Sequence, residues 1–496
     1  MAFTTQTFIF VAFPIFMTVY FLALFLQKKG VLSVFLRKIR LRDLALIGIS
    51  ACFYMWACFD DIFRFLAYIL LIYILGRTIE FFRPKNYFIV ARNDGAEEKH
   101  FSLTLPLLWL AAIIAVAVLV HFKYMGLLTD AWNYFFKDTV SKHSIVAPLG
   151  ISFITFSAIS YLADVYKGKA KAGNLIDLSL YLLFFPKVVS GPIVLWRDFH
   201  GQIPERRVSL GLVSDGVNRM MIGFVKKLIL ADTFGACIAS VSSAIDLPTA
   251  WGVALLYMLQ IYYDFSGYSD IAIGLSNILG FSVQENFNFP YLSVSITEFW
   301  RRWHISLGVW FREYVYFPLG GSRYGKTRTV LNVAIVFLLT GIWHGAGVTY
   351  MLWGAINGVC NIVEKLISDK EWYKKTPVAI KWICTATVTF FCWELFRFSD
   401  FSACAEWFRI MFGLKGFSSI PYTWQYYFDS RMITLALVGI LGATLFGLPK
   451  IQDVYRRFLK KTSGYVIYQL ITIVLFIVSL LFMVNSTYSP FIYFQY

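Results

Sequence analysis

Long apolar runs recur along almost the whole of this 496-residue chain, and they constrain its fold more than any other feature. The first run, FIFVAFPIFMTVYFLALFL at 8–26, is long enough to cross a hydrocarbon layer of about 30 Å at about 1.5 Å per residue. Hydrophobic residues make up 58% of the chain and charged residues only 15%, which leaves too few polar side chains to cover a water-soluble surface. The sequence therefore predicts an all-α, polytopic membrane protein.

The run at 8–26 has no basic stretch before it and no small-residue cleavage site after it, so we expect a retained helix rather than a removed signal peptide. No polar linker interrupts the chain. We expect one membrane domain over 1–496, with N-terminal helices in 1–100, a core in 101–367 and C-terminal helices in 368–496. The predicted spans are 8–26, 44–59, 62–82, 102–122, 145–162, 211–231, 250–263, 329–343, 348–367, 378–396, 431–448 and 465–484.

The net charge of +16 is concentrated in connectors between predicted spans. Basic residues in short loops mark the cytoplasmic side of a membrane protein, so the charge indicates topology and argues against a nucleic-acid partner. Both chain termini are then expected outside. The basic residues fall into three groups, in the connectors 27–43 (Lys28, Lys29, Arg37, Lys38, Arg40, Arg42), 365–381 (Lys365, Lys370, Lys374, Lys375, Lys381) and 450–461 (Lys450, Arg456, Arg457, Lys460, Lys461).

Two hydrophobic stretches are broken by proline and glycine. These are 174–196, which contains Gly191-Pro192, and 287–321, which contains Pro290 and Gly320-Gly321. Non-helical backbone at membrane depth survives only where it is buried in protein or lines a wet cavity. The breaks therefore predict re-entrant helices around an internal chamber, with the two glycine-containing pairs shaping its walls.

The stretch 257–321 is too polar for a lipid-facing helix and too aromatic for a soluble loop. Ionisable groups at membrane depth are costly and usually face a protein interior or a water path. Glu298 and Arg302 lie four apart and are predicted to pair on one helix face. Arg301 and His304 lie three apart on another face, where the guanidinium favours a neutral imidazole. The alternative is a salt-bridged interfacial helix, with snorkelling arginines and a belt of Trp300, Trp303 and Trp310.

His344 follows a predicted helix that starts just after the basic residues at 326–328. Fifteen residues place it roughly 22 Å across the membrane, at the turn of a helical hairpin. Gly341, Gly345 and Gly347 are expected to allow close helix approach and to leave room for a substrate. The alternative is a packed histidine hydrogen-bonded to the backbone.

A buried neutral imidazole can take a proton from a hydroxyl as that oxygen attacks a carbonyl. Thioester acyl transfer needs such a base, an oxyanion donor and aligned substrates. No GxSxG, HExxH, Walker A or GxGxxG motif appears, so neither a serine nucleophile nor a metal site is predicted. The seven cysteines form no CxxC pair, and we expect buried, inert thiols.

Several motifs closely resemble those of the membrane-bound O-acyltransferases, in the bacterial branch of alginate O-acetyltransferase membrane subunits. The motifs are WHGAG (343–347), EFWRRWHISLGVWFREYVYFPLGG (298–321), YYDFSGYSDIAIG (262–274) and ENFNFPY (285–291). Further landmarks are SYLADVYKGK (160–169), FFPKVVSGPIVLWRDF (184–199), WELFRF (393–398) and SPFIYFQY (489–496). The resemblance covers nearly the whole chain and implies a multi-helix funnel with a central tunnel.

The resemblance also implies a function. Acetyl would pass from a cytoplasmic thioester, such as acetyl-CoA, to hydroxyls of an extracytoplasmic polysaccharide through a partner protein. No cofactor is bound, and the setting is the bacterial inner membrane. His344 matches the family's catalytic histidine, which acts as the base or orients the hydroxyl, and His304 matches the second histidine, which positions a substrate. Further tunnel or substrate candidates are Trp300, Arg301, Arg302, Trp303, Asp264, Asp270, Asn288, Glu298, Arg312, Trp343 and Gly345.

The sequence is also compatible with three other functions. The first is D-alanine transfer to teichoic acid from a carrier protein by the same fold. The second is a transporter or channel, whose solute flux survives loss of His344. The third is a non-catalytic scaffold of glycan export.

Overall fold

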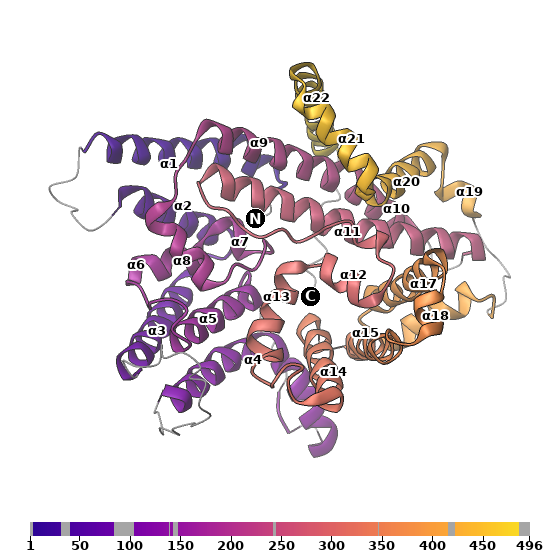
Figure 1. Cartoon of the computed structure of the whole chain (residues 1–496), viewed down its shortest axis with the longest axis horizontal. Coiled ribbons are helices and arrows are strands. Elements are labelled where there is room, and N and C mark those ends of the chain that lie inside the picture. The colour runs from indigo at the N-terminus through magenta and orange to yellow at the C-terminus, as the bar shows by residue number, and fades with distance from the viewer. Residues whose placement is uncertain are drawn as a thin grey trace. The chain divides into compact units, whose positions relative to one another are not determined.

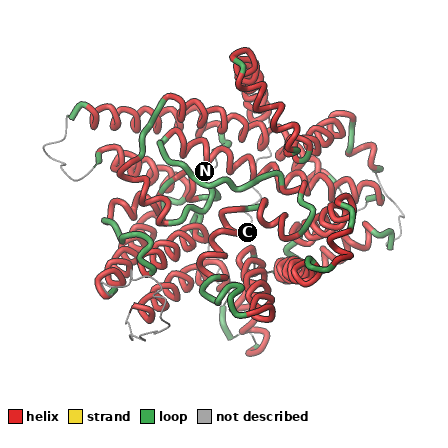
Figure 2. Tube along the Cα trace, viewed as in Figure 1, coloured by secondary structure: helices red, strands yellow, loops and turns green. Residues whose placement is uncertain are grey.

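The computed structural model describes residues 3–30, 40–83, 104–137, 139–141, 147–241, 245–345, 347–414 and 422–485. Within these ranges the ordered elements are helices, and no strand is formed (Figure 2). The all-α prediction is confirmed. Arg37 and Lys38 of the first basic connector and the motif at 489–496 lie outside the described residues.

Seven of the described helices are long and apolar enough to cross a membrane, and each overlaps one of the predicted spans. The predicted spans 211–231, 250–263 and 348–367 also lie on helices, as do residues 44–57 of the span 44–59 and residues 151–162 of the span 145–162, but these helices are not among the seven. The seven are Phe8–Lys28, Asp61–Phe82, Thr104–Phe136, Gly325–His344, Val378–Arg397, Ser430–Gly447 and Thr462–Asn485.

The chain divides into two compact units, one of residues 1–213 with 276–283 and one of residues 214–275 with 284–496. The prediction of one domain in three parts stays a prediction. Helices η1 to α8 belong to the first unit, and α1 to α8 are labelled in Figure 1. They are η1 (Phe8–Ala12), α1 (Phe13–Lys28), α2 (Leu41–Ala57), α3 (Asp61–Phe82), α4 (Thr104–Phe136), α5 (Ile151–Tyr166), α6 (Leu175–Leu183), α7 (Phe185–Val188) and α8 (Trp196–Glu205).

Buried polar groups tie the helices of the first unit together. The Arg206 side chain pairs with Asp43 at 2.6 Å, and Arg42 donates to the carbonyl oxygens of Ile203 and Arg206. Arg42 therefore holds α2 against α8. Its charge is buried in this contact and is not an exposed loop charge that would indicate the cytoplasmic side. The stretch 174–196 is broken as predicted, and a Cβ at Gly191 would collide with the Pro186 carbonyl.

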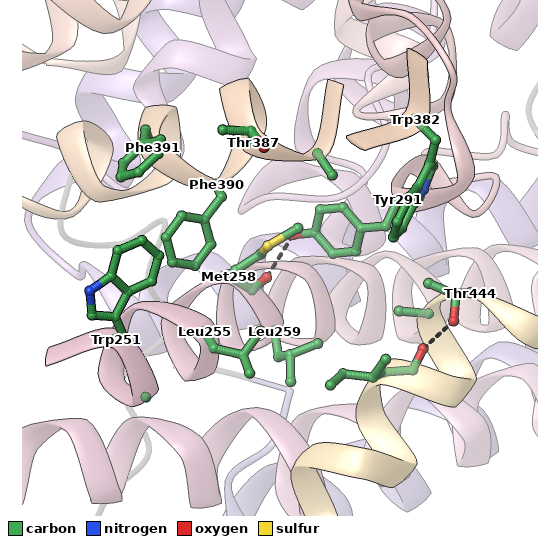
Figure 3. A pocket seen from close by; sticks show the side chains of 14 residues that line it. Trp251, Leu255, Met258, Leu259, Tyr291, Trp382, Thr387, Phe390, Phe391 and Thr444 are labelled. Carbon is green, nitrogen blue, oxygen red and sulfur yellow. Dashed lines mark hydrogen bonds between the residues drawn. The ribbon is translucent and has the colours of Figure 1, made fainter. Parts of the chain in front are cut away.

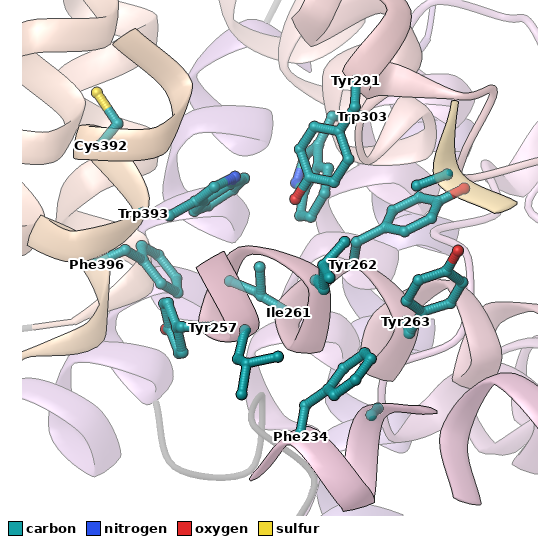
Figure 4. Close-up of a cluster of buried hydrophobic side chains, with 14 of the residues drawn as sticks. Phe234, Tyr257, Ile261, Tyr262, Tyr263, Tyr291, Trp303, Cys392, Trp393 and Phe396 are labelled. Carbon is teal, nitrogen blue, oxygen red and sulfur yellow. The ribbon is translucent and has the colours of Figure 1, made fainter. Parts of the chain in front are cut away.

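The second unit holds the remaining helices. Its centre is an aromatic cluster around Tyr262, Tyr291, Trp303, Trp393 and Phe396, drawn in Figure 4. The helices are α9 (Leu210–Phe224, which begins in the first unit), η2 (Val225–Ala231), α10 (Asp232–Ser240), α11 (Leu247–Ile278), η3 (Pro290–Leu292), α12 (Ile296–Arg302), α13 (Ile305–Phe311), η4 (Arg312–Tyr316), α14 (Gly325–His344), α15 (Val348–Ile367), α16 (Glu371–Lys375), α17 (Val378–Arg397), α18 (Phe401–Met411), α19 (Trp424–Tyr427), α20 (Ser430–Ala443), η5 (Leu445–Gly447), α21 (Pro449–Lys460) and α22 (Thr462–Asn485).

Helices α14 and α15 form the predicted hairpin and pack backbone to backbone. A Cβ at Gly341 would lie 2.6 Å from the Tyr350 carbonyl oxygen, and a Cβ at Gly354 would lie 2.6 Å from that of Phe337. Because no side chain fits there, glycine is needed for the close approach. The prediction of close helix packing is confirmed at Gly341, and Gly354 adds a second close contact that the sequence analysis does not single out.

The cysteine prediction is only partly right. Cys237, Cys392 and Cys404 are buried, whereas Cys52 and Cys384 are exposed on α2 and α17. An apolar run predicts a helix, but it does not say which of its faces packs against protein. The exposed thiols lie on the faces that the other helices leave uncovered.

Candidate active site

His304 stands at a break between two short helices. Helix α12 ends at Arg302, Trp303 is extended, and His304 has φ +45° and ψ +53° before α13 begins at Ile305. A left-handed conformation costs a non-glycine residue roughly 1–2 kcal/mol and persists only where the surroundings enforce it. Since the helix does not continue through this break, the predicted helix face shared by Arg301 and His304 does not exist.

A buried asparagine enforces the break. The Ile305 N–H donates to the Asn286 carbonyl at 3.0 Å, and the Ser306 hydroxyl donates to Asn286 Oδ1 at 2.6 Å. The Asn286 amide in turn donates to Ser269 Oγ on α11 at 3.1 Å. Asn286 is fully buried, so these bonds are shielded from water. They fix the backbone on the C-terminal side of His304.

The His304 imidazole is 2% exposed, and neither Nδ1 nor Nε2 has a hydrogen-bond partner among the described residues. The ring of Phe265 packs edge-on against it, with ring centroids 4.7 Å apart. Burial lowers the pKa of His304 to about 3, so the ring is neutral at pH 7. The predicted neutral form is thus explained by desolvation rather than by a neighbouring guanidinium. A buried polar ring without a partner usually marks a site where a ligand supplies one.

His304 lines a cavity of about 560 Å³ in the second unit. Three cationic side chains, Arg301, Arg312 and Lys365, line it as well, and the described lining residues include no Asp or Glu. Volumes of a few hundred Å³ are typical of small-molecule sites. The other lining residues are Gln284, Thr297, Trp300, Trp303, Ile305, Leu307, Gly308, Val309, Phe311, Tyr316, Val333, Val336, Phe337, Thr340 and Asn361.

The cavity follows the α14–α15 hairpin from its basic end inward. Lys365 lies in the last turn of α15, whereas Thr340 lies near the end of α14, one helical turn before His344. Helix α12 is fixed against α15, because Glu364 accepts the N–H groups of Ile296 and Thr297. The hairpin therefore positions the cavity wall that carries Trp300 and Arg301.

His344 ends α14 and is 5% exposed. Its ring packs edge-on against Trp353 and Phe396, at centroid distances of 5.1 and 4.9 Å. It is not among the residues that line the 560 Å³ cavity. Trp343 links the two histidines, since its ring lies 4.5 Å from that of His344 and 6.4 Å from that of His304.

Comparison with known proteins identifies the family of the chain. Residues 97–395 match the model of MBOAT, the membrane-bound O-acyltransferase family. The chain is 34% identical to the probable alginate O-acetylase AlgI of Pseudomonas putida, over 100% of both chains. The chain belongs to the membrane-bound O-acyltransferase family. It is a multi-pass membrane O-acyltransferase of the alginate O-acetylase type.

Two other relatives of this acyltransferase are named for other activities. It is 30% identical to the peptidoglycan O-acetyltransferase of Helicobacter pylori, over 67% of this chain and 69% of that one. It is 32% identical to the teichoic acid D-alanyltransferase of Streptococcus thermophilus, over 47% of this chain and 59% of that one.

The remaining predicted site residues of the acyltransferase divide into two groups. Trp300, Arg301, Trp303 and Arg312 line the cavity with His304. Trp303 and Trp310 are buried, at 2% and 4% exposure, so the alternative of an interfacial tryptophan belt is wrong. Tryptophans at a lipid interface keep one edge exposed to the headgroups.

The second group forms ion pairs outside the cavity. Arg302 pairs with Glu298 at 2.6 Å, as predicted, and both side chains are 30% exposed. Asp270 is bound by Arg219 and Lys226, each at 2.7 Å. Asp264 lies 2.8 Å from Lys227. These charges brace helices and do not face His304.

Two site predictions need correction. Asn288 is exposed and contributes its backbone N–H to the Arg302 carbonyl, whereas its neighbour Asn286 holds the site. The expected space for substrate beside Gly345 is filled, because the Tyr350 ring lies 2.5 Å from where a Cβ would stand. Close helix packing takes up the volume that glycine frees.

Sequence reasoning missed several residues of the site. Asn286, Ser306 and Glu364 position its backbone, and Thr340, Asn361 and Lys365 line the cavity. The sequence predicts for Lys365 only a place in a basic connector on the cytoplasmic side. The one usable signal was the clustering of Asn286 with Asn288 within the quoted motif at 285–291.

Proposed function

We propose that this acyltransferase passes an acetyl group from a cytoplasmic thioester to hydroxyls of an extracytoplasmic polysaccharide, through a partner protein, in the bacterial cytoplasmic membrane. The observation that carries the proposal is His304. A neutral imidazole without a partner ends a cavity whose charged side chains are all cationic.

The charge of the cavity supports a phosphate-bearing thioester as the donor. Arg301, Arg312 and Lys365 are exposed at its wall, where they can bind phosphate oxygens. The basic residues that predict the cytoplasmic side lie at the same end of the hairpin as Lys365. A cytoplasmic donor would therefore enter with its phosphates at the basic end and its thioester toward His304.

The chemistry needs one proton acceptor. A hydroxyl oxygen attacks the thioester carbonyl, the new C–O bond forms and the C–S bond breaks. The hydroxyl proton goes to an imidazole and then to the leaving thiolate, so charge and atoms balance. In the proposed division of roles, His344 is the base or orients the hydroxyl, and His304 positions the thioester in the cavity.

Acetyl-ester analysis of the cell-surface polysaccharide tests this proposal. A deletion strain is complemented with wild type, His344→Ala, His304→Ala or the exposed control His121→Ala, with membrane levels matched by immunoblot. Loss of a general base or its partner costs roughly 10²–10⁴-fold in rate, so both active-site variants should lose surface acetylation and the control should keep it. Full acetylation by a well-expressed His344→Ala protein would overturn the proposal.

D-alanine transfer is the second candidate, favoured by the teichoic acid D-alanyltransferase relative. That match covers 47% of this chain, against 100% for the alginate O-acetylase relative. Membranes that contain the protein can be given either labelled acetyl-CoA or a labelled D-alanyl carrier protein. Label transferred from the carrier protein alone would favour D-alanine.

A further inference from the structure

A second cavity, of about 840 Å³, lies in the second unit at the ends of α20 and α22 that are opposite the basic helix α21. Since basic residues mark the cytoplasmic side, this cavity belongs on the extracytoplasmic side. Its lining is mixed in polarity and contains Leu228, Asp232, Thr233, Ala236, Cys237, Ser240, Tyr426, Tyr427, Asp429, Arg431, Met432, Phe482 and Asn485.

Asp232 is the feature that points to a ligand. It is 4% exposed, and its Oδ1 accepts from Lys227, whereas its Oδ2 has no hydrogen-bond partner in the part of the chain that the structure describes. Lys227 also lies 2.8 Å from Asp264, so one ammonium serves two carboxylates. A buried carboxylate oxygen without a donor is costly, and a hydroxyl or amide from a ligand in the cavity would satisfy it.

The rim adds flat aromatic surface. The rings of Tyr422 and Tyr426 stack with centroids 4.1 Å apart, and the two residues are 47% and 65% exposed. Tyr426 also lines the cavity, with Asp429, Arg431 and Asn485 close to it in the lining. Exposed tyrosines offer an apolar face together with a polar edge. Pyranose rings have the matching chemistry, with C–H groups on their faces and hydroxyls around their edges.

A contrasting cavity shows what a hydrocarbon site would look like. It has about 650 Å³ and lies between α11, α17 and α20 (Figure 3). Its polar groups are bonded internally: the Tyr291 hydroxyl donates to the Met258 carbonyl, Trp382 Nε1 to the Tyr291 carbonyl, and the Thr444 hydroxyl to the Ile440 carbonyl. The 840 Å³ cavity differs, because its polar groups include one that still lacks a donor.

We infer that the 840 Å³ cavity is a binding site for a hydroxyl-rich glycan segment of the polysaccharide that finally receives the acetyl group. The inference rests on the proposed function. The polar lining disfavours a lipid chain. Lys227, which binds Asp232, also pairs with Asp264 of α11, the residue before Phe265, whose ring packs on His304.

Glycan binding to the full chain in lipid nanodiscs tests the inference. Saturation-transfer NMR is recorded with three soluble hexasaccharides: a uronate, an N-acetylhexosamine and a neutral glucan. Ala236→Trp places an indole in the cavity from an exposed position of α10, and Ala239→Trp places one on the same helix at a position that does not line the cavity. Tyr426→Ala removes the rim ring, and the exposed Tyr134→Ala on α4 is its control.

We expect at least one hexasaccharide to bind wild type, Ala239→Trp, Tyr134→Ala and His344→Ala alike. Ala236→Trp and Tyr426→Ala should weaken that binding at least about tenfold. No binding by any of the three, or equal binding by Ala236→Trp, overturns the inference. If Ala236→Trp abolishes surface acetylation while no saccharide binds, the cavity receives a partner protein and the glycan inference is wrong.

The same samples separate the two proposals. Acetyl transfer from labelled acetyl-CoA without saccharide binding leaves the proposed function standing and overturns the glycan site. Saccharide binding that Ala236→Trp removes, without transfer from any thioester, supports the glycan site and counts against the proposed function.

Discussion

The surroundings of His304 and His344 differ in nearly every respect. His304 lies in a left-handed break between two short helices, lines a cationic cavity and has no hydrogen-bond partner. His344 ends a regular 20-residue helix and is enclosed by Trp343, Trp353 and Phe396. The first site is built for contact with a ligand and the second for a fixed ring orientation. The contrast suggests that the two imidazoles act at different stages of one transfer.

The largest expected effect separates these stages. His304→Ala should raise the KM for the thioester, and His344→Ala should lower kcat, with losses in kcat/KM of roughly 10²–10⁴-fold in each case. Steady-state kinetics in nanodiscs with a soluble acceptor measures both. A lower kcat with an unchanged KM for both variants would mean that the two histidines do not act at different stages, despite their different surroundings.

The second prediction concerns the asparagine that holds the break. Asn286→Ala removes the buried hydrogen bonds that Asn286 forms with Ser306 and Ser269, so we expect a loss of about 1–3 kcal/mol in the free energy of unfolding. Activity should fall with it, because His304 is no longer held in place. Asn288→Ala, two residues away and exposed, should stay within about 0.5 kcal/mol of wild type. Denaturant titration in micelles compares the pair, and equal losses would remove the special role of Asn286.

The pH dependence of stability reports on the burial of His304. Burial lowers the folded-state pKa of His304 to about 3, below the ordinary histidine value of 6.5, so the unfolded chain takes up the proton first as the pH falls. Stability should therefore be lost from about pH 6.5 downward, by up to about 1.4 kcal/mol per pH unit. His304→Gln should remove this slope, and the exposed control His121→Gln should keep it. Thermal unfolding between pH 4 and 7 shows which occurs.

The smallest effects distinguish two neighbouring arginines. Arg302 pairs with Glu298 at a partly exposed position. Arg302→Ala should therefore change the free energy of unfolding by only about 0.3–0.5 kcal/mol and leave the KM for the thioester unchanged. Arg312→Ala removes a charge from the cavity and should raise that KM several-fold. A larger change in KM for Arg302→Ala than for Arg312→Ala would place the donor outside the cavity.

Regular helices were predictable here because apolar runs determine them. The hairpin expected at 329–343 and 348–367 is found at Gly325–His344 and Val348–Ile367. The pairing of Glu298 with Arg302 was predictable too, because it depends on spacing within one helix turn. The family resemblance identified both histidines before their surroundings were known.

The break at His304 was not predictable from its own segment. A left-handed residue is usually signalled by glycine or asparagine, and EFWRRWHIS contains neither. Its cause is Asn286, 18 residues earlier in the chain, acting through tertiary hydrogen bonds. Local periodicity carries no information about such a partner. For the same reason the shared face of Arg301 and His304 was predicted wrongly.

The left-handed backbone at residue 304 also limits how this enzyme can diverge. Any replacement there must satisfy an unusual main-chain geometry as well as present a polar ring to the cavity, and asparagine, the side chain that best tolerates that geometry, has no ring. A lineage that loses this imidazole therefore has few functional substitutions at position 304 through which it could return to histidine. New donor specificities should arise instead at Gln284, Thr297 and Asn361, cavity-wall residues that the conformation leaves free to vary.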